Sequence, residues 1–548
     1  MDKKGRLHLE IQCRGKRCYG VIRSSFREHG KVRHANHGRL NGLSFEQLKL
    51  IQAAFRGDVV PSGDRQALEL LGSREYGASG ALMALAAELG LDRAIYSRPE
   101  QWVKDCQAMI VGRLVCCGSK LKLSQQWING VLWELCGVKG PVDVDRHCYE
   151  PMDRLLARQK AIQKYLAEKH LKTTTAPAVL YDITGSYMEG EYKGSSLVAF
   201  GHNRDGKKGH EQIVIGLVCS AEGCPVAVEV FRGNTRDAAT VGDKVTELQK
   251  LYGLKELVFV GDRGMVTRTQ SEQLRQRQGV STISALTHAQ LVELLDRQVI
   301  QMEFFDQRDL AEASDPQQPG RRYVLCRNPQ TQAHERRKRA ELMEATRQRL
   351  DKIVASSRRA KPERLGSQVG RVLEKYRMCK FVEWEIKVDP DGLGRLHWQW
   401  NQQKIEAEER FDGCYIVVAE GQDAKSFNAA ELVETYKNLL QVEQAFRNLK
   451  TVQLEVRPVH HQLDERIRCH VFICMLAYYL QWHMMRRLQP LIDEDGEGKQ
   501  RRWTVKNILE RLKGIRRERV RLNGIEFEQN TIPDEDQQRI LDLLGVKL

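Results

Sequence analysis

The sequence predicts a multidomain α/β protein, because segments of short apolar strands alternate along it with longer helical stretches. At 548 residues the chain exceeds what a single hydrophobic core usually organises, and its length suggests roughly three to four domains. Apolar residues make up 41% of the chain and charged residues 29%. This composition is ordinary for a folded protein and excludes fibrous and wholly disordered classes.

An uneven excess of basic residues points to nucleic acid as a partner. The chain holds 87 Lys and Arg against 72 Asp and Glu, a net charge of +15, and residues 1–60 alone hold 13 against 5. Basic segments neutralise phosphates and release the counterions condensed on nucleic acid. An anionic membrane surface, or solubility alone, is the alternative interpretation of the charge.

The 14 cysteines and the apolar segments bear on metal and membrane binding. No CxxC pair or matching His spacing occurs, so the sequence predicts no zinc site. No apolar segment follows the basic N-terminus, and we expect a cytoplasmic protein with reduced thiols. The longest apolar stretch, residues 471–480, is about half a membrane span, which predicts a buried helix and no membrane partner.

Local patterns predict the order of the elements. Residues 1–60 alternate apolar and polar with glycine turns, as short strands do, and a helix begins at Ser44, which forms a capping-box pattern with Gln47. Residues 80–170 are mostly helical. The apolar segments AVLYDITG, SLVAFG, QIVIGLVCS, PVAVEVF, ELVFVGD and STISAL then predict a sheet that starts with an antiparallel meander.

The sequence changes again after these strands. Residues 291–424 combine polar helices with tryptophan-rich strands such as FVEWEIKV and RLHWQW, and we interpret them as an insertion. One long helix over residues 429–450 and an apolar helix over residues 465–485 follow. The last segment is basic, and we expect it to be helical.

Two acids stand where apolar strands end. Asp182 lies in AVLYDITG and Asp262 in ELVFVGDRGM, each close to a glycine. A strand end holds a carboxylate rigidly, and oxygen ligands gathered at such ends are what Mg²⁺ prefers. For each acid taken alone, the capping of a turn is the alternative role.

A third acid, Glu443, lies in YKNLLQVEQAFRNLK within the predicted long helix. Tyr436, Glu443 and Lys450 are spaced seven residues apart, which places them along one face of that helix. A solvated or coiled-coil face is the alternative for this spacing. The apolar residues around Glu443 favour a packed helix.

These segments resemble the DDE transposases of bacterial insertion sequences, in particular the insertion-sequence-four-like group. That group carries its third acid in a signature of Tyr, two residues, Arg, three residues, Glu, six residues and Lys. Tyr436, Glu443 and Lys450 match this spacing, and Leu439 replaces the Arg. The segments FRGNTRDAAT, VGDRGM, FDGCYIVVA and RPVHHQLDERIRCHVF extend the resemblance.

The resemblance implies an RNase H-like catalytic core interrupted by a mixed helical and β-rich insertion, with an N-terminal DNA-binding region. The expected domains are a basic N-terminal DNA-binding region (1–125), a helical connector (126–175), the first part of the RNase H-like core (176–290), the insertion (291–424), the second part of the core with the catalytic helix (425–490) and a C-terminal helical segment (491–548).

The resemblance also implies a transposase that cuts and joins the ends of an insertion sequence by two-metal phosphoryl transfer. Asp182, Asp262 and Glu443 would be catalytic and hold two Mg²⁺ ions, with Mn²⁺ as a substitute. The partners would be double-stranded DNA with terminal inverted repeats, target DNA and a second copy of the chain, in the bacterial cytoplasm at the nucleoid. An RNase H-like DNA nuclease without strand transfer and an inactive DNA-binding derivative are the alternatives.

Further side chains are candidates for DNA contact: Tyr436, Lys437, Arg447, Lys450, Trp398 and Trp400. Lys437 or Arg447 is the candidate to compensate for the Arg that Leu439 replaces. The two tryptophans lie among basic residues and are candidates for stacking on extruded bases. Packing within a strand is the alternative for both. The segment GHNRDGKKGH imitates a phosphate-binding loop, but Lys208 stands where Ser or Thr is needed, so nucleotide binding is not expected. The resemblance places this segment on the hairpin after the first catalytic strand, which makes its basic residues further candidates for DNA contact.

Overall fold

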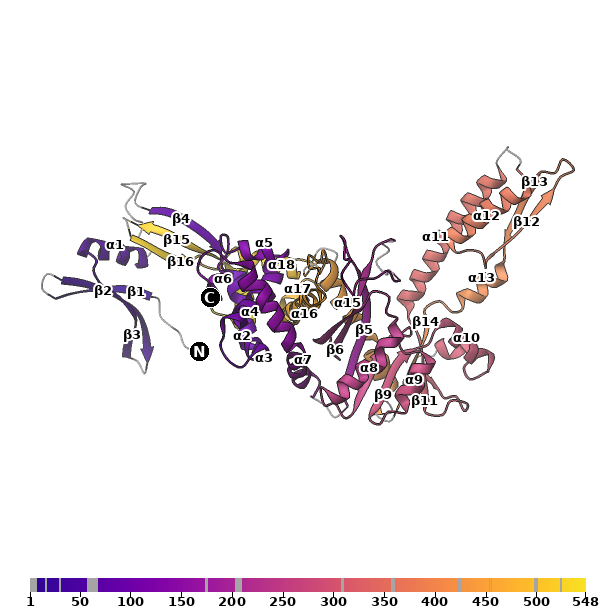
Figure 1. The fold of residues 1–548 in the computed structure, drawn as a ribbon, viewed down its shortest axis with the longest axis horizontal. Coiled ribbons are helices and arrows are strands. Elements are labelled where there is room, and N and C mark those ends of the chain that lie inside the picture. The colour runs from indigo at the N-terminus through magenta and orange to yellow at the C-terminus, as the bar shows by residue number, and fades with distance from the viewer. Residues whose placement is uncertain are drawn as a thin grey trace. The chain divides into compact units, whose positions relative to one another are not determined.

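The fold of the chain is shown by a computed structural model (Figure 1). The structure describes residues 7–14, 17–28, 31–56, 68–172, 176–202, 209–306, 310–355, 360–421, 426–452, 454, 456–496, 501–522 and 525–548. The chain forms two compact units. Unit 1 comprises Met1–Ala81, Gln126–Leu135 and Lys506–Leu548, and unit 2 comprises Leu82–Gln125 and Cys136–Val505.

Unit 1 contains two small antiparallel sheets, and the first 40 residues supply one of them, as the alternating pattern predicts. That sheet has the order β1–β2–β3 (Leu7–Arg14, Arg17–Glu28, Lys31–Leu40) and the other has the order β16–β15–β4 (Ile525–Asn530, Arg516–Leu522, Leu68–Glu75). The helices of this unit are α1 (Phe45–Arg56), α6 (Leu132–Leu135), α18 (Val505–Lys513) and α19 (Glu535–Leu544), and α2 (Gly77–Glu88) runs across its boundary. Pairing of β4 with β15 therefore joins segments from opposite ends of the chain.

Helix α1 begins with the predicted capping box. The Ser44 hydroxyl accepts a hydrogen bond from the Gln47 backbone N–H at 3.2 Å, and the Gln47 side-chain oxygen accepts one from the Ser44 N–H at 2.8 Å. These two bonds satisfy backbone donors that the first helical turn leaves open. The helix buries Leu48 and contacts β1.

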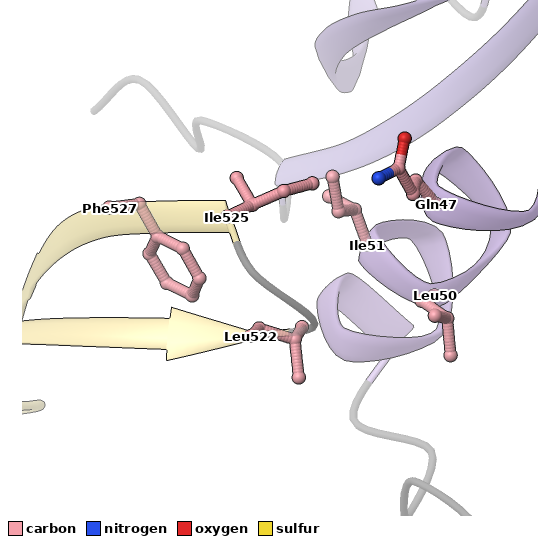
Figure 2. A pocket seen from close by; sticks show the side chains of 6 residues that line it. All are labelled: Gln47, Leu50, Ile51, Leu522, Ile525 and Phe527. Carbon is pink, nitrogen blue, oxygen red and sulfur yellow. The ribbon is translucent and has the colours of Figure 1, made fainter. Parts of the chain in front are cut away.

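A small apolar pocket lies between α1 and the β15–β16 hairpin (Figure 2). Its lining consists of Gln47, Leu50, Ile51, Leu522, Ile525 and Phe527. Because the first helix and the C-terminal hairpin share this apolar lining, a fragment that ends at residue 125 would expose part of it to water.

Cys13 and Cys18 form a disulfide across the β1–β2 hairpin. The expectation that all cysteines are reduced thiols is wrong for this pair. The two residues face each other in the antiparallel register, with their Cα atoms 4.1 Å apart. Only the register of the hairpin brings them together, and their spacing in the sequence does not specify it.

Unit 2 is built on an eight-stranded mixed sheet with the order β10–β11–β14–β9–β8–β5–β6–β7. The strands are β5 (Ala178–Tyr187), β6 (Gln212–Ser220), β7 (Pro225–Arg232), β8 (Leu257–Gly261), β9 (Val280–Ala285), β10 (Ala311–Ala313), β11 (Arg321–Arg327) and β14 (Cys414–Glu420). Strands β5, β6 and β7 form the predicted antiparallel meander, whereas β5, β8 and β9 run parallel. Strands β6, β8 and β9 are buried along their whole length, as continuous apolar runs predict.

The predicted strand at residues 196–201 is absent from the described sheet, where this segment makes a single bridge between Ala199 and Gln212. Strand β6 already pairs with β5 on one side and with β7 on the other. It therefore has no free edge at which another strand could pair along its length.

Helix α16 (Asp464–Arg487) is the apolar helix predicted over residues 465–485. It packs on β7, α4 (Gln101–Val115) and α7 (Glu150–His170), and all of residues 471–480 are buried. No helix in the described part of the chain combines the length and the apolar character that crossing a bilayer requires.

The remaining helical elements of unit 2 lie before, between and after these strands in the sequence. They are α3 (Leu91–Ile95), α5 (Lys120–Gln125), η1 (Asp145–Tyr149), α8 (Asp237–Lys250), α9 (Arg268–Arg275), α10 (His288–Asp296), η2 (Met302–Asp306), α14 (Ala429–Lys437), α15 (Leu439–Arg447), η4 (Asn448–Val452) and α17 (Gln489–Glu494). Helix α8 begins directly after the turn in FRGNTRDAAT, as that sequence predicts.

A separate subdomain lies between β11 and β14. It consists of α11 (Pro329–Val354), α12 (Pro362–Tyr376), the hairpin β12–β13 (Val382–Val388, Gly394–Trp400) and α13 (Gln402–Glu409). Its core contains Leu350, Val369, Leu373 and Phe381. Strands β10, β11 and β14 also fall within the expected insertion, residues 291–424, yet they pair into the central sheet.

The C-terminal segment 491–548, expected to be helical, also contains the hairpin β15–β16. The sequence between these strands is Asn-Gly, which is typical of two-residue hairpins. Charged residues alternate with apolar ones on both sides of this dipeptide, which is the two-residue period of a β-strand. The high Arg and Glu content of the segment obscures this period.

We predict that Phe472→Ala destabilises unit 2, because Phe472 is fully buried in α16. Removal of a buried aromatic ring should cost about 3–5 kcal/mol. Hydrogen exchange of the α16 amides, followed by mass spectrometry, measures this loss as faster exchange. The exposed Glu465 on the same helix provides the control, since Glu465→Gln should leave exchange nearly unchanged.

Candidate active site

Asp182 lies on β5, which is flanked on both sides by other strands of the sheet. Its neighbours Tyr181 and Ile183 are buried, while Asp182 itself is half-buried. The Oδ1 atom of Asp182 accepts a hydrogen bond from the backbone N–H of Ile183 at 2.8 Å. The strand thus holds the carboxylate by its backbone as well as by the packing on either side.

Asp262 directly follows β8, the parallel neighbour of β5. The last register pair of these two strands is Tyr181 with Gly261, so Asp182 and Asp262 are the next residue of each strand. The Oδ1 atom of Asp262 accepts a hydrogen bond from the backbone N–H of Arg263 at 2.7 Å. Parallel pairing of β5 with β8 therefore places the two acids side by side at the same end of the sheet.

Glu443 lies on α15, and the helix predicted over residues 429–450 is interrupted before it. Helix α14 ends at Lys437 and α15 starts at Leu439, with Asn438 between them at ψ −13°. Asparagine is a poor helix former, because its side chain competes for backbone hydrogen bonds. Tyr436, Glu443 and Lys450 consequently lie on α14, α15 and η4, and the prediction of one continuous helix face is wrong.

One open cavity of about 350 Å³ brings the three acids together. Its lining includes the acids Asp182, Asp262 and Glu443 and two of the candidate DNA-contact residues, Tyr436 and Lys437. Strand β5, the end of β8, and helices α14 and α15 supply these side chains. Segments far apart in the sequence thus meet in one acidic cavity within unit 2.

The Tyr436 hydroxyl donates a hydrogen bond to Oδ1 of Asp262, 3.3 Å away. Burial raises the pKa of Tyr436 above its ordinary value, and the negative charge of Asp262, the hydrogen bond to it and the charge of Glu443 raise it further, against the opposing effect of Arg263. The phenol therefore stays protonated at neutral pH and serves as a donor in the cavity.

Lys450 is tied to the same strand as Asp182. Its Nζ donates a hydrogen bond to Oγ1 of Thr184 at 2.5 Å. Thr184 lies two residues beyond Asp182 and so points to the same face of the sheet. The ammonium group of Lys450 is thereby placed on that face.

Two charged residues of the cavity were not among the candidates from the sequence. Arg263 lines the cavity beside Asp262. Its place directly after Asp262, in the sequence Asp-Arg-Gly, is the sequence feature that could have identified it. Glu335, on α11, adds a fourth carboxylate, but its Oε2 accepts a hydrogen bond from the Gly413 backbone N–H at 2.8 Å. This bond gives Glu335 a structural role next to β14.

The remaining DNA-contact candidates lie outside the lining of this cavity. Arg447 is exposed on α15. Trp398 and Trp400 lie on β13, with their rings edge to face at 5.4 Å, and both pack against the core of the α11–α13 subdomain. Trp384, opposite Trp398 in the hairpin, is 41% exposed. The basic residues Arg204, Lys207 and Lys208 of the segment GHNRDGKKGH lie outside the described residues.

The three acids fit a divalent cation by the chemistry of their donor atoms. Asp182, Asp262 and Glu443 offer hard oxygen ligands from one cavity, and Mg²⁺ in phosphoryl-transfer enzymes is held by a few carboxylates together with water and substrate. Adjacent carboxylates repel each other, and a bound cation offsets this repulsion.

The family model of the transposase DDE domain matches residues 173–480, more than half of the chain. The chain belongs to this family. Members of the family catalyse the DNA cleavage and transfer of transposition and use divalent metal ions. No curated protein matches the chain.

We predict that Tyr436→Phe lowers the rate of DNA cleavage about tenfold, since it removes one charge-assisted hydrogen bond to Asp262, the equivalent of about 1.4 kcal/mol. Single-turnover cleavage at saturating divalent ion measures the effect. Tyr415 lines the same cavity, and Tyr415→Phe is the matched control, expected to cleave at the unaltered rate. Equal losses in the two variants would contradict a specific role for the Tyr436 hydroxyl.

Proposed function

We propose that this protein is the transposase of a bacterial insertion sequence of the insertion-sequence-four-like group. It cuts DNA at the ends of its element and joins the released 3′ ends to target DNA. The observation that carries the proposal is the single cavity lined by Asp182, Asp262 and Glu443. The strand order β7–β6–β5–β8–β9, with a leading meander and parallel strands behind it, supports an RNase H-like core.

Asp182, Asp262 and Glu443 would hold two Mg²⁺ ions through their carboxylate oxygens. When bound, the two ions supply Lewis-acid stabilisation of the attacking and leaving oxygens in an in-line displacement. The protein's own residues orient the reacting phosphate. Tyr436 fixes the Asp262 carboxylate through its hydrogen bond.

Basic side chains around the cavity would hold the DNA backbone next to the acids. Arg263 and Lys437 line the cavity itself. Lys450 is held by Thr184 on the strand of Asp182, and Arg447 is exposed on the helix of Glu443. Lysine and arginine at such positions neutralise phosphates and fix the register of the duplex. Because Leu439 cannot supply the charge of the family's Arg, Lys437 and Arg447 would supply it.

Unit 1 would bind the terminal inverted repeats. Strand β3 carries Arg33 and Arg39, both exposed, in the N-terminal segment where residues 1–60 hold 13 Lys and Arg against 5 Asp and Glu. The excess of basic residues in the N-terminal segment is the basis for assigning DNA binding to the β1–β3 sheet. On β15, Arg519 and Arg521 both form ion pairs with Glu526, and we assign these two arginines a structural role in the hairpin. Two copies of the chain would pair the two ends of the element.

We predict that Asp182→Asn, Asp262→Asn and Glu443→Gln each abolish cleavage and joining while DNA-end binding persists. Each change keeps the shape of the side chain and removes a charge that binds the metal, so the rate should fall by several orders of magnitude. A strand-transfer assay with labelled element ends, combined with a binding assay, measures both steps.

Asp237→Asn is the control for these three variants, because Asp237 begins α8 and does not line the cavity of the acids. This variant should keep substantial activity. Near-normal cleavage by any of the three acid variants would remove that residue from the metal site. Cleavage without joining by the unaltered chain would favour a nuclease, and end binding without cleavage would favour an inactive derivative.

We also predict that the double change Arg33→Ala and Arg39→Ala weakens binding of full-length protein to duplex DNA. Each lost phosphate contact should reduce the slope of log K against log salt by about 0.9. Fluorescence anisotropy over a range of salt concentrations measures that slope. Arg519→Ala, which removes an arginine paired with Glu526, should leave the slope unchanged, and an equal reduction there would contradict the assignment to β3.

A further inference from the structure

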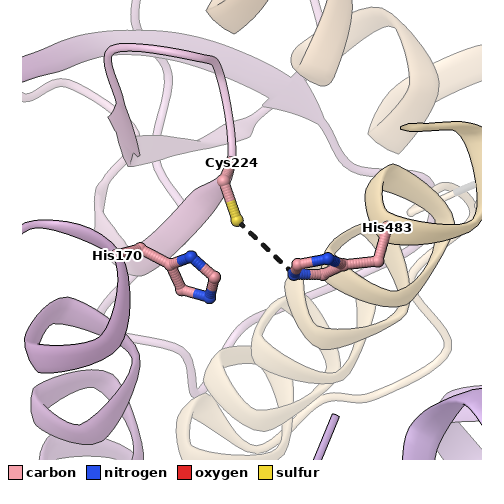
Figure 3. Close-up of side chains that lie close together, drawn as sticks. All are labelled: His170, Cys224 and His483. Carbon is pink, nitrogen blue, oxygen red and sulfur yellow. Dashed lines mark hydrogen bonds between the residues drawn. The ribbon is translucent and has the colours of Figure 1, made fainter. Parts of the chain in front are cut away.

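A second cluster of metal-ligand side chains lies apart from the acids. His170 ends α7, Cys224 lies just before β7, and His483 lies on α16. One ligand atom from each residue lies within 4.8 Å of the other two. Figure 3 shows the Cys224 thiol directed toward the space between the two imidazole rings. None of the three residues lines the cavity of the acids.

We propose that His170, Cys224 and His483 bind one Zn²⁺ ion that fastens α7 and α16 to the turn between β6 and β7. Thiolate and imidazole are the donors that zinc takes, whereas Mg²⁺ takes oxygen. The fourth position of a tetrahedral shell belongs to water, which can reach the cluster because His170 and His483 are only half-buried.

The spacing of the donor atoms suits this ion. Zn–S and Zn–N bonds of about 2.3 and 2.0–2.1 Å place the ligand atoms of a tetrahedral site about 3.3–3.6 Å apart. The Cys224 Sγ and the His483 Nε2 are 4.0 Å apart, and all three ligand atoms lie within 4.8 Å of one another, so contractions of at most about 1.5 Å close the cluster on the ion.

The surroundings hold the three side chains in place. Gly223 adopts φ 84°, a left-handed conformation, directly before Cys224 and so sets the direction of the turn. The Tyr479 hydroxyl lies 3.0 Å from the His170 Nε2, in hydrogen-bonding contact, and its ring packs edge-on against both imidazoles. Outer contacts of this kind orient histidine ligands in metal sites.

The protonation states of the free cluster are compatible with metal binding. Burial lowers the pKa of His170 to about 4 and that of His483 to about 3, so both imidazoles are neutral at neutral pH. Burial also raises the pKa of the Cys224 thiol. Binding of Zn²⁺ therefore forms a Zn–S bond as the thiol releases its proton to water. Glu222 contributes a nearby negative charge, and Lys169 and Arg486 contribute positive ones.

An aromatic cluster is the competing interpretation, since Tyr479 and the two imidazoles pack together without an ion. That packing accounts for the rings. The Cys224 thiol of the adjacent turn is buried, is directed between the two imidazoles and is in hydrogen-bonding contact with the His483 Nε2 at 4.0 Å, so it adds to this packing the soft donor that zinc takes.

Metal binding by purified full-length protein tests the proposal. After removal of bound metal, the chain should take up one equivalent of Zn²⁺ in excess Mg²⁺, and Co²⁺ in its place should give visible ligand-field bands and a near-ultraviolet thiolate charge-transfer band. Cys224→Ser should abolish the charge-transfer band and weaken Zn²⁺ binding by more than about 100-fold. This loss exceeds the decrease in metal affinity that follows when a residue hydrogen-bonded to a metal ligand is changed. His483→Ala should weaken binding comparably.

Three control variants distinguish this site from an exposed thiol, from the acids and from the aromatic packing. Cys379→Ser removes an exposed thiol and should leave both metals bound. Asp182→Asn should leave the Co²⁺ spectrum unchanged, because the acids lie in a different cavity. Tyr479→Phe keeps the ring packing and should keep the stoichiometry. Absence of the charge-transfer band in the unaltered chain would overturn the proposal, and this result does not depend on how any variant folds. Full Zn²⁺ binding by Cys224→Ser would also overturn it.

Discussion

The active-site cavity depends on the parallel pairing of β5 with β8. The register that ends at Tyr181 and Gly261 makes Asp182 and Asp262 the next residue on each strand. Side chains alternate across a strand, so a slip of one residue would move Asp182 to the opposite face of the sheet. Buried apolar residues along both strands fix the register, because a slip would also expose them. The hydrophobic core thereby holds two like charges together, an arrangement that a divalent cation stabilises.

The other parts of the cavity are attached to this pair of strands. Helix α15 contacts β5 and carries Glu443, while α14 contacts β8 and carries Tyr436. The break at Asn438 lets the two short helices meet the sheet separately. Helix α11 lines the cavity at its start and packs in the subdomain core farther along. One helix thus links the cavity to the α11–α13 subdomain.

Much of this organisation could be predicted from local sequence, because the strands of the central sheet are short apolar runs and each catalytic candidate follows a local pattern. The capping box at Ser44 and the buried residues 471–480 are local in the same way. The break at Asn438 escaped prediction, since one asparagine interrupts little of the helical periodicity. Pairings without a sequence signal of their own could not be predicted: the β4–β15 ladder, the Cys13–Cys18 register and the meeting of His170, Cys224 and His483 each depend on the finished fold.

The function proposed for this protein requires that Asp182, Asp262 and Glu443 form one divalent-metal site. Crystals of the protein bound to an element end and soaked in Mn²⁺ test this requirement directly by anomalous diffraction. We predict anomalous peaks in the cavity, with carboxylate oxygens of all three acids within coordination distance, about 2.0–2.2 Å for an ion close to Mg²⁺ in its preferences. Peaks that lack Glu443 as a ligand, or ions bound only elsewhere in unit 2, would contradict it.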